Sequence, residues 1–198
     1  ISKKFSSQMI IENQDELEKI KSSNKQVIFI SGHFNNFELM AMHLEKSGID
    51  LAAIYRPLNN LFLNPIMEKI RKKYICKKQI KKGITGTKEL LKEFKKGTSI
   101  ALMIDQRVSE GVESDFFGKK ALTTTIPAQF IKKFDVAVVP IYIERLIDDK
   151  FKLKIFENVK FSQDDSVDQI TLKLNKILEK MIMTNPDQWI WTHSRWKI

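Results

Sequence analysis

The chain has 198 residues, of which 42% are hydrophobic and 29% are charged. This length is typical of one compact domain, which buries enough apolar surface to fold without disulfides. The composition excludes a wholly disordered or a fibrous chain. A single cysteine, Cys76, excludes an intramolecular disulfide framework and a multi-cysteine zinc site. We therefore expect one domain.

The charge balance is basic, because 34 Lys and Arg residues oppose 24 Asp and Glu residues and give a net charge of +10. This excess favours an acidic partner such as nucleic acid, an anionic lipid surface or an acidic carrier protein. Charge alone does not choose among these partners. The sequence holds no run of about 18 uncharged apolar residues, so we expect no transmembrane segment in it.

Short apolar runs alternate with segments of helical period along the chain. The apolar runs predict strands at 27–30, 51–55, 99–104, 136–143 and 151–156. The helical segments predict helices at approximately 36–47, 61–73, 85–96, 125–134 and 166–183. Gly48 and Gly97 stand where helices end, and Pro140 indicates a sheet edge or a bulge in the fourth strand.

This alternation predicts an α/β fold with a largely parallel central sheet and helices on both faces. Ligands of such sheets bind outside the carboxyl ends of the strands, so polar residues directly after an apolar run are the best site candidates. They are His33 with the nearby Glu38, Arg56, and the segment 105–107. We expect these three places to converge at one rim.

His33 is the strongest candidate for chemistry. It follows the first strand and precedes a helix, whose N-terminus keeps an imidazole neutral and able to accept a proton. A carboxylate beside it would orient the ring, and Glu38 lies five positions on. Two structural interpretations stay open, because Asn35-x-x-Glu38 also matches a capping box and because His33 also suits a packed histidine.

Other mechanisms lack the residues that they need. The sequence contains no serine-hydrolase elbow, no His-Glu-x-x-His motif and no phosphate-binding loop. We therefore expect no metal and no cofactor. The other two histidines, His43 and His193, are expected to be structural.

A basic segment from Lys69 to Lys82 holds eight Lys and Arg residues and no acid. Apolar residues at near-helical spacing stand just upstream, among them Leu61, Phe62 and Met67. An apolar stripe beside a cationic cluster suits an anionic membrane surface. A solvated face and nucleic-acid binding stay open, although Tyr74 is the single aromatic residue in the segment on which a base can stack.

Five sequence blocks resemble those of the lipid A biosynthesis acyltransferases (late lauroyl/myristoyl transferases), a branch of the lysophospholipid-acyltransferase superfamily. The first is a His-x4-acid motif. The blocks are Gly32-His33-Phe34-Asn35-Asn36-Phe37-Glu38-Leu39, Tyr55-Arg56-Pro57, Met103-Ile104-Asp105-Gln106-Arg107, Phe116-Phe117-Gly118 followed by Thr123-Thr124-Thr125, and Gln188-Trp189-Ile190-Trp191 with Arg195-Trp196-Lys197. They occur in the family order and cover about positions 27 to 197.

The resemblance implies an acyltransferase-like fold and transfer of a fatty acyl group from an acyl-acyl carrier protein to a hydroxyl of a lipid A precursor or related glycolipid. It makes His33 the general base and Glu38 its orienting partner, with no metal. Arg56 and Arg107 are expected to bind an anion or phosphate near the reacting carbonyl. The further substrate-binding candidates are Asp105 and Gln106 in the acceptor site, with Phe117, Gly118 and Arg195.

The resemblance also implies a place at the cytoplasmic face of the bacterial inner membrane, with an anionic membrane surface as partner, and it disfavours nucleic acid. Family members normally begin with a hydrophobic anchor and a further helical region. We therefore expect a single acyltransferase domain over 1–198 that lacks the N-terminal membrane anchor. Two alternatives stay open: acylation of another lipid, such as a lysophospholipid or ornithine-type lipid, and a non-catalytic basic module that binds membrane or nucleic acid.

Overall fold

A seven-stranded sheet with the strand order β1-β9-β8-β2-β5-β3-β4 forms the centre of the computed structural model, which describes residues 8–197. Its strands are β1 (Met9–Glu12), β2 (Ile28–Ser31), β3 (Leu51–Tyr55), β4 (Lys78–Lys81), β5 (Ser99–Met103), β8 (Val138–Arg145) and β9 (Phe151–Ile155). The pairing of β8 with β9 is antiparallel, and the other pairings in this sheet are parallel. The prediction of a largely parallel α/β sheet is thus confirmed.

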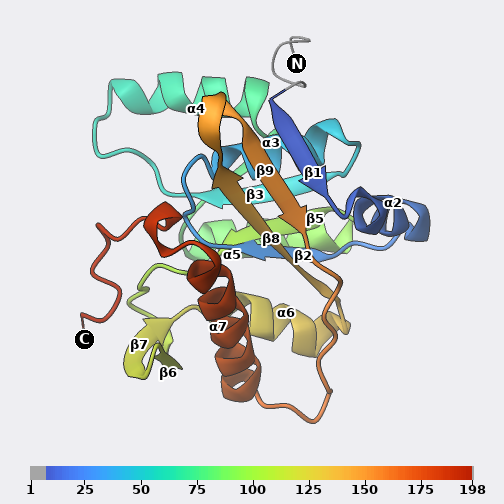
Figure 1. The fold of residues 1–198 in the computed structure, drawn as a ribbon. Helices are drawn as coiled ribbons and strands as arrows, with labels where there is room; N and C mark the ends of the chain where they lie inside the picture. Colours follow the sequence, from blue (N-terminus) through green and yellow to red (C-terminus); the bar gives the residue numbers. More distant parts are fainter. Residues whose placement is uncertain (1–7, 198) are drawn as a thin grey trace.

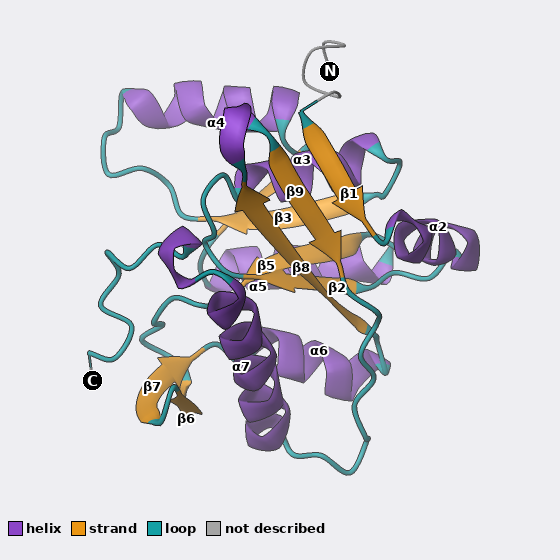
Figure 2. Ribbon diagram, in the orientation of Figure 1, coloured by secondary structure: helices purple, strands orange, loops and turns teal. Residues whose placement is uncertain are grey.

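Helices cover both faces of the sheet (Figures 1 and 2). They are α2 (Gln14–Ser23), α3 (Glu38–Lys46), α4 (Leu63–Tyr74), α5 (Ile84–Lys95), α6 (Ile126–Phe134) and α7 (Val167–Thr184). Right-handed crossovers between parallel strands place α3 and α4 on one face and α5 and α6 on the other. A separate hairpin of β6 (Val112–Phe116) and β7 (Lys119–Thr123) lies beside α7.

The central strands are mostly apolar, as expected for strands that are covered on both faces. All four residues of β2 are buried, as are the first six of β8. The five expected strands and five expected helices all form, each within two residues of the expected bounds. Elements with weaker apolar patterns were not expected, namely β1, α2, β4 and the β6–β7 hairpin. The edge strand β4, for example, buries only Ile80 and is otherwise polar.

Gly48 and Gly97 end α3 and α5 as expected. Their φ angles of 93° and 96° lie in the left-handed region that favours glycine. The expectation that Pro140 marks a sheet edge is wrong, because β8 lies between β2 and β9. Pro140 is the last residue of β8 that pairs with β2, and pairing with β9 begins at Ile141. The missing N–H therefore falls where the strand changes partners.

No helix within residues 8–197 is long and apolar enough to cross a membrane.

Candidate active site

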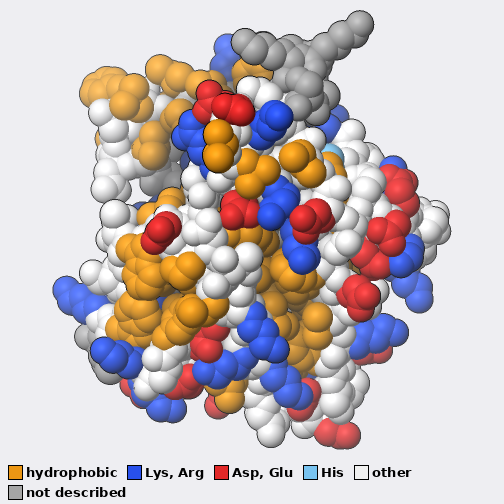
Figure 3. Space-filling model, viewed as in Figure 1, with side chains coloured by type: hydrophobic (Ala, Val, Ile, Leu, Met, Phe, Trp, Pro, Cys, Tyr) orange, Lys and Arg blue, Asp and Glu red, His pale blue; other side chains and the backbone are white. Residues whose placement is uncertain are grey.

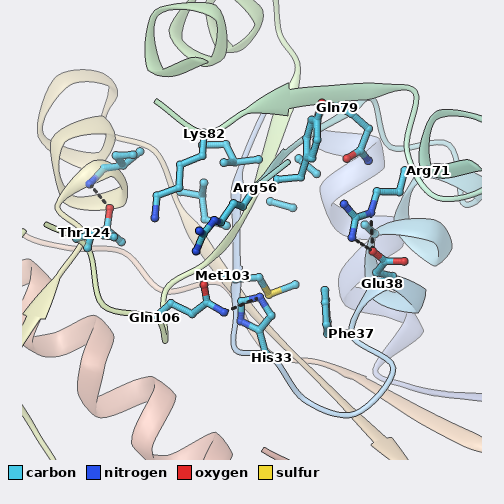
Figure 4. Close-up of a pocket in the computed structure, with 18 of the residues that line it drawn as sticks. His33, Phe37, Glu38, Arg56, Arg71, Gln79, Lys82, Met103, Gln106 and Thr124 are labelled. Atoms are coloured by element: carbon cyan, nitrogen blue, oxygen red, sulfur yellow. Dashed lines mark hydrogen bonds and ion pairs between the residues drawn. The ribbon is translucent and has the colours of Figure 1, made fainter. Parts of the chain in front are cut away.

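A pocket of about 380 Å³ opens at the carboxyl ends of four parallel strands (Figure 4). Its polar lining includes residues that directly follow these strands: His33 after β2, Arg56 after β3, Lys82 after β4 and Gln106 after β5. His33, Arg56 and Gln106 therefore converge at one rim, as the parallel sheet predicts. This volume lies within the usual range for a small-molecule site, about 300–1,000 Å³.

The imidazole of His33 is held by Asp105. Asp105 Oδ1 lies 2.7 Å from His33 Nδ1, and Oδ2 accepts the backbone N–H of His33 at 2.7 Å. An ionised carboxylate only accepts hydrogen bonds, so in the neutral form of the ring His33 Nδ1 carries the proton and Nε2 has the free lone pair. Gln106 Nε2 lies 3.5 Å from this second ring nitrogen. The Nε2 atom of His33, which lines the pocket, can therefore accept a proton.

Asp105 is only 2% exposed. Burial raises its pKa, but hydrogen bonds from His33 and from Trp189 Nε1, 2.9 Å from Oδ2, outweigh burial and hold the pKa below its usual value. The carboxylate is therefore ionised at neutral pH. Gly32 lets the chain pass this close, because a Cβ there would lie 3.3 Å from Asp105 Oδ2 and 3.1 Å from the Leu178 side chain.

The C-terminal segment holds the loop that carries His33. Ile190 N donates to the His33 carbonyl at 2.9 Å, and Asn35 N donates to the Gln188 carbonyl at 2.8 Å. The Asn35 side chain also donates to Gln188 Oε1. It forms no capping box, because α3 begins at Glu38 without a side-chain cap. The Gln188–Trp191 block thus supports the loop that carries His33 without lining the pocket itself, a role that its aromatic sequence did not reveal.

Glu38 lines the same pocket but pairs with Arg71 of α4. Arg71 Nε and Nη2 lie 2.7 and 2.6 Å from Glu38 Oε1. Within residues 8–197, Glu38 has no hydrogen bond to His33. The expected contact between the two is therefore corrected: the orienting carboxylate is Asp105, while Glu38 begins α3 and reaches towards α4. Figure 4 shows Glu38 and Arg71 facing each other on one side of the pocket.

Arg56 and Lys82 extend into the pocket on the other side (Figure 4). Within the described part of the chain, neither side chain forms an ion pair. Two unpaired cations near His33 make this side suitable for an anionic group. Lys82 was not expected as a site residue, because it follows β4, the polar edge strand that the apolar pattern did not predict.

Arg107 lies outside the pocket lining, which corrects its expected place at the reacting carbonyl. Its backbone N–H donates to His193 Nε2 at 2.9 Å, and its Nε donates to the Lys197 carbonyl at 2.6 Å. Burial lowers the pKa of His193, which suits an acceptor role for the neutral ring. Arg107 therefore ties the C-terminal segment to the loop after β5. Asp105 does not line the pocket either, because it lies behind His33. Its expected place in the acceptor site is therefore corrected.

Three further candidates are also placed away from the pocket. Phe117 and Gly118 form the two-residue turn of the β6–β7 hairpin, with φ angles of 53° and 75°. Arg195 is completely buried; its Nη1 donates to the Leu122 carbonyl and its Nη2 to Thr123 Oγ1, both at 2.7 Å. These contacts fix the hairpin to the C-terminal segment, so a substrate contact by these residues does not fit the structure.

The remaining pocket walls are largely apolar. They are formed by Phe37, Ala41, Ala53, Ile54, Ile75, Ala101, Leu102, Met103, Val108 and Ile126. Such walls suit an aliphatic chain beside the polar rim. Among residues 8–197 there is no group of three or more His, Cys, Asp or Glu side chains that could hold a metal ion.

The chain is similar in sequence to known acyltransferases. The whole chain, residues 1–198, matches the family model described as bacterial lipid A biosynthesis acyltransferase. The chain is 26% identical over 196 residues to the lipid A biosynthesis palmitoleoyltransferase of Escherichia coli (strain K12), and equally to a lipid A biosynthesis acyltransferase of Shigella flexneri. These alignments cover 94% of this chain and 61% of each relative. The chain thus spans about three-fifths of the length of these relatives.

A solved structure shares the fold. The 1-acyl-sn-glycerophosphate acyltransferase PlsC from Thermotoga maritima superposes with a TM-score of 0.57 at 16% identity, over 94% of this chain and 75% of that chain. At this identity the likeness is one of fold.

Proposed function

The chain belongs to the bacterial lipid A biosynthesis acyltransferase family, and from this premise we propose that it transfers a fatty acyl group to a hydroxyl of a lipid A precursor or related glycolipid. The donor is an acyl-acyl carrier protein, and His33 is the general base. The observation that carries the proposal is the His33–Asp105 pair at the rim of an apolar-walled pocket. The strongly basic chain, with a net charge of +10, suits an acidic carrier protein.

The proposed reaction is a direct acyl transfer. His33 Nε2 takes the proton of the acceptor hydroxyl while the hydroxyl oxygen attacks the thioester carbonyl carbon. The carbonyl electrons move to oxygen and form a tetrahedral oxyanion. The oxyanion collapses to the new ester, the C–S bond breaks, and the departing thiolate takes the proton back from the imidazolium. The ionised Asp105 stabilises that imidazolium, as a carboxylate does in a Ser-His-Asp triad.

The two unpaired cations have a place in this scheme. Arg56 and Lys82 stabilise negative charge, either on the oxyanion or on an anionic group of the acceptor. Glu38 is the second catalytic candidate. Arg71 contacts its Oε1, so Oε2 is available to orient the acceptor hydroxyl. We place the reaction at the cytoplasmic face of the bacterial inner membrane, in keeping with the lipid A names of the relatives.

Replacing His33 by Ala tests the proposal. The purified protein is mixed with an acyl-acyl carrier protein and a lipid A precursor, and the product is read by mass spectrometry. We expect turnover to fall about 10²–10⁴-fold, the usual contribution of a positioned acid or base. The matched control is His43→Gln in α3, which lies outside the pocket lining and should keep its turnover. Near-normal turnover of a folded His33→Ala protein contradicts the proposal.

A further inference from the structure

Helix α4 has its amphipathic faces reversed. Leu63, Ile66, Ile70 and Tyr74 share one side of the helix and are 42–56% exposed. No residue of α4 is buried. A surface helix of a globular domain normally turns its apolar stripe to the core and its polar side to water. The exposed stripe of α4 therefore contributes little to the stability of this domain and needs another explanation.

A second, polar side of α4 holds the helix to the domain. Arg71 binds Glu38 through two nitrogens and lies over the Tyr55 ring at 5.8 Å. Glu68 lies 3.4 Å from Lys81 and accepts a hydrogen bond from Asn64 within the helix. Because ion pairs and hydrogen bonds fasten the helix, its apolar stripe is left free.

The loop before α4 extends the stripe. Leu61 and Phe62 are 82% and 90% exposed. Figure 3 shows hydrophobic side chains gathered at the upper left of the molecule, where Figure 1 places α4. Monomeric proteins rarely expose a contiguous apolar patch unless it meets a partner or a membrane. We call the patch formed by Leu61, Phe62, Leu63, Ile66, Ile70 and Tyr74 the α4 stripe.

Cations border this stripe. Lys69 and Lys73 are exposed beside it on α4 itself, and Lys73 lies 4.9 Å from the centre of the Tyr74 ring. A helix with an apolar face flanked by lysines is typical of an element that lies in the interface of an anionic bilayer. A nucleic acid would use the cations but leave the aliphatic stripe in water.

We propose that the α4 stripe docks this protein on an anionic lipid bilayer, with its apolar side chains in the acyl layer and the flanking lysines among the headgroups. Arg71, on the underside of the same helix, lines the His33 pocket together with Ile75. Docking through α4 therefore brings the pocket close to the bilayer surface. The use of this position for acceptor entry rests on the proposed function, whereas the docking itself does not.

Vesicle flotation tests the docking. The probes are vesicles of phosphatidylcholine alone and vesicles of phosphatidylcholine and phosphatidylglycerol in equal parts. The protein should float with the anionic vesicles and much less with the neutral ones. The double variant I66S/I70S should bind anionic vesicles at least about tenfold more weakly, since two isoleucines lose their burial. The control L172S/M183S changes side chains of α7 that are 38% and 63% exposed and should float like wild type.

A second pair of variants separates local charge from total charge. K69Q/K73Q should weaken binding to anionic vesicles, because each lysine near the surface contributes about 1 kcal/mol, or roughly fivefold. K119Q/K150Q removes the same charge from other exposed positions and should keep the binding. Equal losses in both double variants would overturn the proposal.

Three further results would also overturn it. One is wild-type protein that stays unbound in the presence of anionic vesicles. Another is I66S/I70S that floats like wild type. The third is a lowered melting temperature of I66S/I70S, which would mean that the stripe packs against the protein. His33→Ala protein should float like wild type, so that failure of the proposed reaction and failure of docking are distinguished.

Discussion

Asp105 contacts His33 at two points, with Oδ1 2.7 Å from the ring Nδ1 and Oδ2 2.7 Å from the backbone nitrogen. Both positions require an acceptor, and the second point is shared with the Trp189 indole N–H. Asp105→Asn keeps the shape of the side chain but replaces one acceptor oxygen by a donor. We expect kcat to fall about 10²–10⁴-fold, because the ring then loses either its tautomer or its orientation.

Steady-state acyl transfer and a thermal melt check this prediction together. The comparison variant is Trp189→Phe, which removes one hydrogen bond to Asp105 and leaves the His33 contacts intact. It should lower stability, because a hydrogen bond and part of a buried ring are lost, and it should lower activity much less than Asp105→Asn. A folded Asp105→Asn protein with wild-type kcat would show that the carboxylate does not serve the base.

The strand register explains why these two residues meet. Ser31 of β2 is the register partner of Met103 of β5, so His33 and Asp105 each lie two residues beyond a matched pair. The rule for parallel sheets places both residues at the rim. The order of strands is set by packing across the whole domain, and for this reason the sequence alone could not name β2 and β5 as neighbours. Spacing along the chain pointed to Glu38 instead.

Other residues show the same contrast between features that a segment's own sequence predicts and features that depend on contacts with distant segments. Elements with a long apolar pattern, such as β3 and α7, are predicted from the sequence because the pattern of apolar residues in each one indicates its buried face. Arg195 belongs to a recognisable block, but its 0% exposure depends on β7 and Phe116, which are distant in sequence. Motif resemblance therefore locates important residues without telling a pocket residue from a buried structural one.

The Glu38–Arg71 pair should behave as one unit. Glu38→Gln weakens the ion pair, and Arg71→Gln leaves the carboxylate without its cation at the pocket wall. We expect each change to lower kcat/KM. The double change should lower it about as much as the larger single change, because the effects of substitutions at residues in direct contact are not additive. A double-variant cycle measured on acyl transfer gives the coupling. Independent, additive losses would contradict a shared role.

Arg56 and Arg107 should respond differently to the same conservative change. Arg56→Lys keeps the charge in the pocket but removes the planar fork, so we expect a lower kcat/KM with unchanged stability. Arg107→Lys shortens the reach to the Lys197 carbonyl and should cost about 1 kcal/mol of stability with little change in kcat/KM. Urea unfolding and acyl transfer are measured on both variants. The reverse pattern would contradict the placement of the two arginines.

The unfolding free energy should depend on pH through His193 and His43. Burial lowers the pKa of both rings below the usual 6.5. Below about pH 6.5 the unfolded chain therefore binds protons that the folded protein does not, and stability falls as the pH drops through the folded pKa values. Above about pH 6.5 both states hold neutral rings, so this contribution is complete there. Protonation of His193 also removes the acceptor for the Arg107 N–H.

Urea unfolding at about pH 7.5, 6.5 and 5.5 measures this dependence. The double variant His43→Gln/His193→Gln should be less stable than wild type at the highest pH, since it loses packing and the acceptor of the Arg107 N–H. Its stability should then change less between the highest and lowest pH than that of wild type, because the two rings with lowered pKa values are gone. Each single variant should lie between the two. If the double variant keeps the full wild-type slope, the two partly buried rings are not the source of the pH dependence.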